Sequence, residues 1–574
     1  MGFSGAYFDG RIYFRPGARG KFKSKELKRG ASLDINTLVL IGPATNGYNC
    51  NDPTLPKSKR VMEFTNFQEA KEVLGGGDLL DAVKGAFSPS KDQRFAIGPT
   101  LIKCLNIADN IQAEVVKDGH TIKAMVPGTN GNKIRFKVIS PTEIVITDGV
   151  ETYKQSNLVQ DDLSIQYTGD SSTATITITS TNITATLAGD QTDGSLGFNL
   201  LISDYPTLFD VVEKISSLTG YTVNVKSKPD FLTADLDYIT GEDISILVNL
   251  KGTFYRQKSF LESTGLVEIE NTTNTPFTAD AVFVYLVNGS TGIWTNTDYI
   301  DAIEFSKNVS GLYRNVCTNN IAVAQALSEC LNFMNSPDGS SETFGGAGCS
   351  TALPFEERLE LAKSINNEYM VYGISPVKAY GFDGVTEKTF DGWYLAILHN
   401  ACKAATNPRE AISQKALNII ESPEILSHSQ AIKAIQTGVL HTKQDDSTKS
   451  WMIEFALTTY QKSDRILSQA SYVCTALAMS KDFRESLQVY TSEIVDDADL
   501  RVFADSKLRE YEKKYGYISP NIYTGEPAAD LNYTIERDGD IVYFIFPDVK
   551  LTSPINFFFH IFNLSLPKGV GTGA

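Results

Sequence analysis

The residues of this chain that could do chemistry are scattered, and they do not fall into a recognisable catalytic spacing. Gly75, Gly76 and Gly77 could suggest a phosphate loop. However, no Lys-Ser or Lys-Thr pair follows them, and they separate two predicted helices where a P-loop would join a strand to a helix. The five histidines lack HExxH or similar ligand spacing, namely His120, His399, His428, His441 and His560. We therefore expect no metal ligands and no bound cofactor.

Other reactive side chains also fit structural roles better. Glu356 and Glu357 lie in LPFEE, where acidic residues favour the start of a helix. Cys349, in GGAGCS, could be a nucleophile, but we favour a small residue in a tight Gly-rich turn. His399, in the apolar segment WYLAILHNA, is predicted to be a core histidine. These patterns predict that the protein is not an enzyme.

The elements around these residues look like a scaffold. Residues 36–47, NTLVLIGPATNG, predict a buried strand that ends in a Gly-Pro turn. Residues 61–108 predict a helix, a glycine break, a second helix and a short apolar strand. From about residue 281 helices again alternate with short apolar strands, which indicates an α/β layer with at least partly parallel strands.

Composition narrows the class of protein. The chain has 574 residues, 42% of them hydrophobic and 21% charged, so we expect an ordinary globular protein of three or four domains. Its formal net charge of -16 argues against nucleic acid as a ligand. Seven scattered cysteines without a CxxC pair fit reduced thiols. The sequence shows neither a signal peptide nor a spanning apolar run, so we expect no direct membrane insertion.

Changes in composition predict five segments. Residues 1–30 form a basic arm that either is solvated or orders on an acidic surface. Residues 31–110 begin an α/β core, residues 111–280 form an inserted β-rich region with alternating Thr and Ile, and residues 281–450 complete the core. Residues 451–574 form a C-terminal domain, in which a Gly-Asp turn predicts a hairpin.

Seven motifs in a fixed order resemble contractile tail sheath proteins of bacteriophages and related contractile injection systems. They are PGARG, LVLIGPATNG, FTNFQEAKEVLGGGDLLDAVKGAF, PGTNGNKIRFKV, SETFGGAG, FALTTYQKSD and the terminal strand. The resemblance implies an α/β multidomain fold with terminal linker strands and an inserted, outward-facing β-rich domain. It also implies a structural protein that polymerises around a tail tube and contracts to drive the tube through the host envelope for genome delivery.

The same resemblance implies the partners and the contact residues. The partners are further copies in a helical sheath, the tail tube protein, and baseplate and tail terminator proteins, in a virion tail assembled in the bacterial host cytoplasm. Strands without partners in their own subunit suit strand addition to a neighbour. The matching linker residues are Gly5, Tyr7, Ile12, Phe14, Arg15, Ile555, Phe557, Phe559, Ile561 and Leu564.

An acidic group in the C-terminal domain could contact the basic arm of a neighbour. Its members are Asp496, Asp497 and Asp499, for which a solvated helix face is the alternative. Other functions stay open at this point. They are the sheath of a phage-derived particle of tailocin or secretion-system type, an adhesion module suggested by the Thr- and Asn-rich strands, and an α/β enzyme with an unrecognised site.

Overall fold

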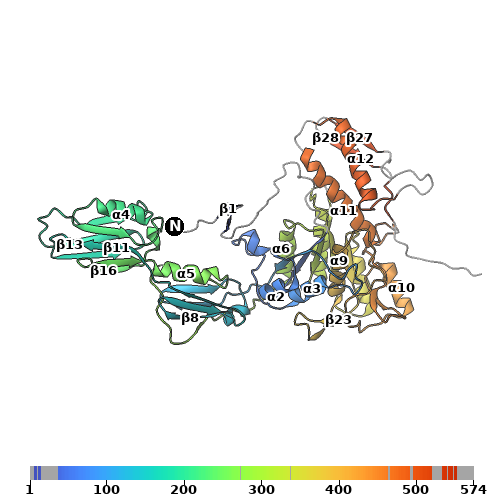
Figure 1. The fold of residues 1–574 in the computed structure, drawn as a ribbon. Helices are drawn as coiled ribbons and strands as arrows, with labels where there is room; N and C mark the ends of the chain where they lie inside the picture. Colours follow the sequence, from blue (N-terminus) through green and yellow to red (C-terminus); the bar gives the residue numbers. More distant parts are fainter. Residues whose placement is uncertain are drawn as a thin grey trace, which may run out of the picture.

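The computed structural model describes residues 6–8, 11–13 and 36–552, except for residues 272, 337, 463, 465, 491–494, 520–532, 539–540 and 547–548. In Figure 1 an α/β body carries two β-rich units on one side and a pair of long helices with a small hairpin at another. The body is built around one sheet.

The sheet of the α/β body has six strands in the order β22-β21-β20-β3-β5-β4. All neighbouring pairs are parallel except β4 with β5. Every residue of the four strands from β22 to β3 is buried, as expected for parallel strands covered on both faces. The predicted α/β core with partly parallel strands is confirmed. The strands are β3 (Thr37–Gly42), β4 (Met62–Phe64), β5 (Leu101–Asn106), β20 (Tyr313–Val316), β21 (Phe344–Gly348) and β22 (Met370–Gly373).

Helices cover both faces of this sheet. One face packs against α2 (Phe67–Leu74), α3 (Asp78–Phe87) and α9 (Gly392–Ala404). The other face packs against α6 (Asn296–Ser306), α7 (Ile321–Met334) and α8 (Phe355–Ile365). Because α3 follows β3 on one face and α7 follows β20 on the other, the chain changes direction between these two adjacent strands.

The glycines between α2 and α3 make a tight turn between helices, as predicted. Gly75 ends α2 with a φ of 69° and Gly77 precedes α3 with a φ of 90°, values that favour glycine. A Cβ on Gly77 would also lie 2.8 Å from the carbonyl oxygen of Pro43. These glycines therefore serve backbone geometry.

The prediction of a Gly-rich turn before Cys349 is wrong, because Phe344–Gly348 is the buried strand β21. Its glycines let α9 approach the sheet very closely. A Cβ on Gly348 would lie 2.2 Å from the backbone of Gly392, and a Cβ on Gly392 would lie 2.0 Å from the carbonyl oxygen of Gly373. These glycines therefore mark a strand on which a helix packs closely, and they do not mark a turn.

Shorter elements complete the α/β body. They are α1 (Lys57–Arg60), α10 (His428–Thr437) and the antiparallel pairs β23 (Val377–Tyr380) with β24 (Glu387–Phe390) and β25 (Thr442–Gln444) with β26 (Trp451–Ile453). The second of these hairpins spans residues 450 and 451, where we placed a domain boundary.

The β-rich region consists of two units, one nested within the other. In the unit next to the α/β body, α5 (Thr253–Ser263) packs on two sheets that share one core. One sheet contains β6 (Glu114–Lys117), β7 (His120–Ala124) and β18 (Val267–Glu270). The other contains β8 (Arg135–Ser140), β9 (Glu143–Thr147), β10 (Thr152–Ser156) and β19 (Val284–Tyr285), and the 3-10 helix η2 (Thr129–Lys133) precedes it.

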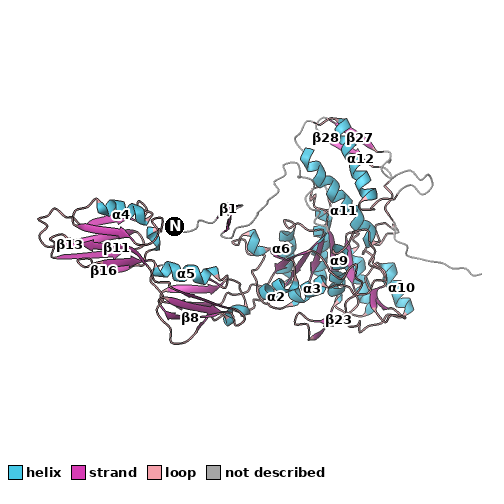
Figure 2. Ribbon diagram, viewed as in Figure 1, coloured by secondary structure: helices cyan, strands magenta, loops and turns pink. Residues whose placement is uncertain are grey.

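The outer unit lies between β10 and α5 in sequence, and Figure 2 shows it at the far end of the molecule. Its helix α4 (Leu208–Ser216) begins with a capping box at Thr207. In β12, threonines point outward while Ala174, Ile176 and Ile178 are buried, so the predicted alternation is confirmed. The other elements are β11 (Asp161–Tyr167), β12 (Thr173–Ile178), β13 (Asn182–Ala188), β14 (Phe198–Leu201), β15 (Tyr221–Val225), β16 (Ile239–Asp243), β17 (Val248–Lys251) and η3 (Thr233–Asp235).

The C-terminal part packs two long helices against a small hairpin. The helices are α11 (Ala470–Leu487) and α12 (Asp497–Lys513), and the short η4 (Gln488–Tyr490) follows α11. β27 (Thr534–Asp538) pairs antiparallel with β28 (Ile541–Ile545), and Asp538 is the partner of Ile541. The predicted hairpin is thus confirmed. Near the amino end, β1 (Ala6–Phe8) pairs antiparallel with β2 (Arg11–Tyr13).

Candidate functional site

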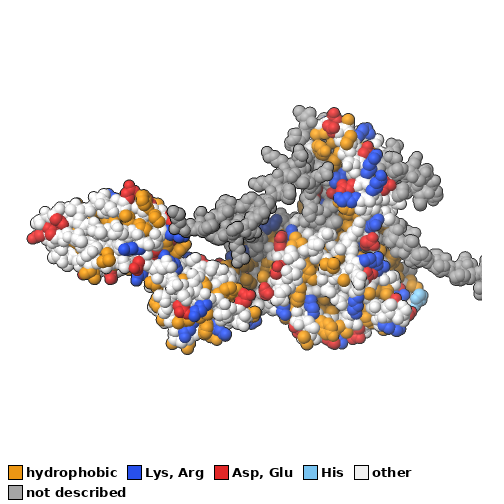
Figure 3. All heavy atoms as spheres, in the orientation of Figure 1, with side chains coloured by type: hydrophobic (Ala, Val, Ile, Leu, Met, Phe, Trp, Pro, Cys, Tyr) orange, Lys and Arg blue, Asp and Glu red, His pale blue; other side chains and the backbone are white. Residues whose placement is uncertain are grey.

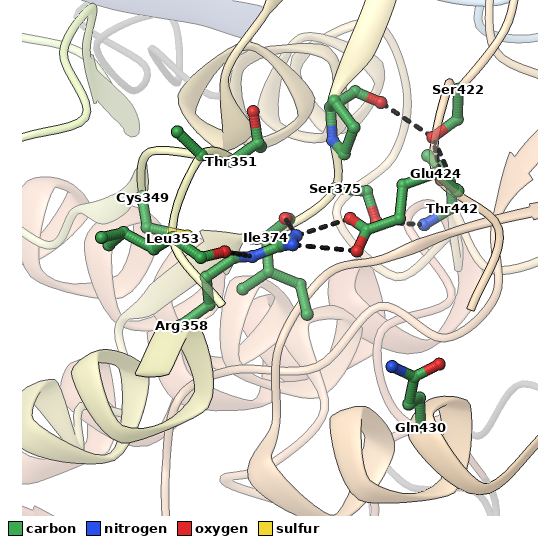
Figure 4. A network of polar contacts seen from close by, with 12 residues as sticks. Cys349, Thr351, Leu353, Arg358, Ile374, Ser375, Ser422, Glu424, Gln430 and Thr442 are labelled. Carbon is green, nitrogen blue, oxygen red and sulfur yellow. Dashed lines mark hydrogen bonds and ion pairs between the residues drawn. The ribbon is translucent and has the colours of Figure 1, made fainter. Parts of the chain in front are cut away.

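A network of polar contacts lies at the carboxyl edge of the parallel sheet (Figure 4). Arg358 of α8 forms a two-pronged ion pair with Glu424, with N···O distances of 2.6 and 2.8 Å. The same guanidinium donates to the carbonyl oxygens of Leu353 and Ile374. All of these contacts hold the chain that follows β21 and β22 to the segment before α10. The network therefore fixes these segments to one another and leaves its charges paired.

Cys349 lies beside this network but is not activated. Its side chain is buried after β21, and its Sγ lies 3.7 Å from the carbonyl oxygen of Gly373. Burial raises the pKa of the Cys349 thiol to about 12, although the nearby Arg358 acts in the opposite direction. Because the thiolate is the nucleophile, this cysteine is unsuited to covalent catalysis at neutral pH.

A polar pocket of about 340 Å³ lies where the chain changes direction between β3 and β20. In open α/β sheets ligands favour this place, at the carboxyl ends of the strands. The pocket is lined by Asp78 at the start of α3, by Asp391 before α9, and by Trp294 and Trp393. Desolvation of its carboxyl group and the neighbouring carboxylates raise the pKa of Asp78, although the residue as a whole is exposed. A phosphate does not fit, because carboxylates already occupy the position that an anion would take.

The motifs PATNG and PGTNG meet at the joint between the α/β body and the first β-rich unit. The side-chain oxygen of Asn46 accepts hydrogen bonds from the backbone N–H of Asn130 (3.2 Å) and the hydroxyl of Thr129 (3.5 Å). The backbone N–H of Gly47 donates to the carbonyl of Pro127. A Cβ on Gly128 would lie 2.3 Å from the Asn46 side chain. The sequence TNG occurs at residues 45–47 and 129–131 and was a signal for this joint, which we did not predict.

Most of the predicted linker residues lie outside the described residues, namely Gly5, Phe14, Arg15, Ile555, Phe557, Phe559, Ile561 and Leu564. Tyr7 and Ile12 are the exceptions, and they are partners in the β1–β2 pair. Their proposed contacts with a neighbouring copy stay predictions.

The predicted acidic group is partly engaged within the chain. Asp496 caps α12 by accepting from the backbone N–H of Asp499 at 2.8 Å, and Asp497 lies 3.0 Å from Arg537. All three carboxylate side chains are exposed on α12 or its cap. Figure 3 shows side chains of both charges interspersed on the visible face of this region. Contact with a basic arm stays a prediction for this group.

The histidines are dispersed. His120 stacks on Phe254 with ring centroids 4.1 Å apart, and His441 lies 2.7 Å from Glu454. His428 begins α10, and His560 lies outside the described residues. Within the described part of the chain, no group of three His, Cys, Asp or Glu side chains could hold a metal ion. Among the helices described, none has both the length and the apolar character that crossing a membrane requires.

The burial of His399 predicts that the protein loses stability at acidic pH. It is fully buried in α9, where its Nδ1 contacts the side-chain oxygen of Asn400 and its Nε2 has no partner. Burial lowers the pKa of His399 to about 3, whereas a histidine in the unfolded chain titrates near ~6.5. The unfolded state therefore gains a proton first, and stability is lost as pH falls from ~6.5 toward ~3, by up to about 1.4 kcal/mol per pH unit.

The test compares urea unfolding of the natural protein and His399→Gln at pH 7 and pH 5. The natural protein should lose more stability over this interval, because the variant lacks the titrating group. Equal losses in both proteins would show that this histidine does not govern the acid response.

Comparisons with known proteins identify similar chains. No family model matches this one. A tail sheath protein of Bacillus phage SP01 is 28% identical over 329 residues, 52% of this chain and 53% of that protein. A putative tail sheath protein of Enterococcus phage phiEF24C is 24% identical over 528 residues, 84% of this chain and 87% of that protein. A solved sheath tail protein from Desulfitobacterium hafniense has a TM-score of 0.51 at 13% identity, over 93% of this chain and 99% of its own.

These relatives are named as tail sheath proteins, and the chain is similar to them in sequence and to the solved sheath tail protein in fold. The two phage relatives confirm the predicted resemblance to tail sheath proteins, and the solved structure confirms the multidomain α/β fold. The match to the SP01 protein spans about half of that relative's length, and the match to the phiEF24C protein spans most of it.

Proposed function

We propose that this chain is the subunit of a contractile phage tail sheath, which polymerises around a tail tube and contracts to drive the tube through the host envelope. The observation that carries this proposal is the β27–β28 hairpin. It is a sheet of only two strands, and neither outer edge pairs with another strand among the described residues. Unpaired edges invite strand addition by another chain.

The two ends of the chain supply the strands for this addition. Residues 5–15 and 555–566 contain the predicted linker residues, and each would pair with the hairpin of a neighbouring copy. Contacts of this kind join different surfaces of successive copies, so they build an open helical polymer. A purely structural role is also supported by Cys349, because burial raises the pKa of this candidate nucleophile.

Contraction would move whole folded units between two packings of the polymer. We propose that these units are the basic arm 1–30, the core formed by 31–110 with 281–450, the outward-facing β-rich region 111–280, and the C-terminal domain 451–574. The tube protein, baseplate and tail terminator proteins would be the other partners, in a virion tail assembled in the bacterial cytoplasm. The sheath of a phage-derived particle would use the same contacts.

Electron microscopy of the purified full-length protein tests the proposal. The expected result is hollow, striated tubes that appear as the protein concentration is raised. A chain that stays monomeric at high concentration across several salts would contradict polymerisation. A tube protein added to the mixture should increase the number of tubes and fix their diameter.

A further inference from the structure

The pocket between β3 and β20 has the composition of a site for an organic cation. It is lined by Trp294 and Trp393, two of the three tryptophans in the sequence, and by the carboxylates of Asp78 and Asp391. Lys and Arg are missing from its described lining. Aromatic faces next to carboxylates attract ammonium and guanidinium groups, because the ring quadrupole and the negative charges act together.

The two carboxylates differ in their hydrogen bonds. Asp391 is held in place, accepting from the backbone N–H and the hydroxyl of Thr351 (2.8 and 2.7 Å) and from Asn319 (2.6 Å). The side chain of Asp78 has no hydrogen bond or ion pair with the residues described. The charge of the nearby Lys388 acts to lower the pKa of Asp78, but the Nζ of this lysine forms its ion pair with the buried Asp81, at 2.7 Å. Asp78 therefore remains available to an incoming cation.

Four helices begin around the pocket. The amino end of α7 is capped by Asn320, and that of α6 by the capping box of Thr295 and Asp298. At the amino ends of α3 and α9 stand the carboxylates of Asp78 and Asp391, where an anion would otherwise be favoured. Trp294, just before that cap, is 43% exposed, so part of the residue is accessible from outside. The partly exposed Trp294, the exposed Asp78 and the half-buried Asp391 together suit a long basic side chain.

We propose that this pocket binds an Arg or Lys side chain from the basic arm of a second copy, an inference that rests on the proposed polymerisation. The arm is the part of the chain that best matches the pocket in charge. Residues 11–29 contain eight basic residues against the single acidic Glu26, whereas the whole chain carries a net charge of -16. The basic residues are Arg11, Arg15, Arg19, Lys21, Lys23, Lys25, Lys28 and Arg29.

We assign the arm to a second copy because the proposed polymer joins each copy to its neighbour through this arm. The acidic group on α12 is a weaker match, since Asp496 caps a helix and Asp497 already lies beside Arg537.

A synthetic peptide of residues 11–29 tests the pocket directly. Titrated into monomeric full-length protein, it should change the tryptophan fluorescence in a saturable way that weakens with salt. Asp78→Asn and Trp294→Ala should each weaken binding at least tenfold. Asp190→Asn, which removes an exposed charge in the outer β-rich unit, is the matched control and should bind normally. A peptide with every Lys and Arg replaced by Gln should not bind.

The inference is overturned if the peptide does not bind, or if Asp78→Asn binds it as tightly as the natural protein. It is also overturned if Asp499→Asn weakens binding and Asp78→Asn does not, since the arm would then sit on α12. Tube formation is scored separately. Tubes without peptide binding would leave the proposed function standing, whereas pocket binding without tubes would contradict the proposed function and retain the site.

Discussion

Gly392→Ala should destabilise the protein by about 3 kcal/mol, at the upper end of what overpacking a core usually costs. A Cβ at this position would lie 2.0 Å from the carbonyl oxygen of Gly373, and both atoms belong to rigid elements, α9 and β22. The helix is buried at every residue and packs on the centre of the sheet, so it cannot move away without opening the core. Urea unfolding should show a much lower midpoint with an unchanged slope.

Gly381→Ala is the matched control. The nearest atoms to a Cβ there would belong to the Lys388 side chain, at 3.1 and 3.2 Å, and to the Asp81 side chain, at 3.3 Å. Because the lysine is flexible, a change of less than about 1 kcal/mol is expected. If both variants unfold at the same urea concentration, the close approach of α9 to the sheet is not a major source of stability.

Removal of residues 1–20 should leave a folded protein that no longer forms tubes. The first strand would be lost from the contact between copies, with several backbone hydrogen bonds that contribute about 0.5–1.5 kcal/mol each. A loss of about 3 kcal/mol raises the concentration needed for assembly by roughly 100-fold. Circular dichroism should be unchanged, and sedimentation should show monomers where the full-length protein forms tubes.

Two further truncations sharpen this test. Removal of residues 553–574 should have a similar effect, because it deletes the other predicted linker strand. Removal of residues 567–574 alone takes away only PKGVGTGA, beyond that strand, and should leave assembly intact. Tubes formed normally by the chain without residues 1–20 would rule out the linker arm.

Several elements could be predicted from sequence because their signals are local. The helix, glycine break and helix around Gly75 appeared as α2 and α3, since apolar spacing and positive-φ glycines act within a few residues. The β12 strand appeared where threonine alternates with apolar residues. The hairpin of β27 and β28 could be predicted from the Gly-Asp pair that lies between the two strands in the sequence.

The candidate pocket could not be predicted in this way. Asp78, Trp294 and Asp391 are more than ninety residues from one another in sequence, and each is unremarkable in its own segment. They come together because β3 and β20 are adjacent in the sheet although about 270 residues separate them in the chain. The TNG joint has the same origin, since Asn46 and Asn130 meet only after the sheet and the first β-rich unit have formed.

The sequence by itself determined the resemblance to tail sheath proteins and the local elements, because motif order, periodicity and turn residues lie along the chain. The tertiary structure decided what the glycines of FGGAG do and which acidic residue is free. In the folded protein these glycines belong to a buried strand that α9 approaches closely, and not to the predicted turn. The side chain of Asp78 has no ion pair, whereas Asp497 lies beside Arg537. Both outcomes depend on contacts between distant segments, which local sequence patterns do not specify.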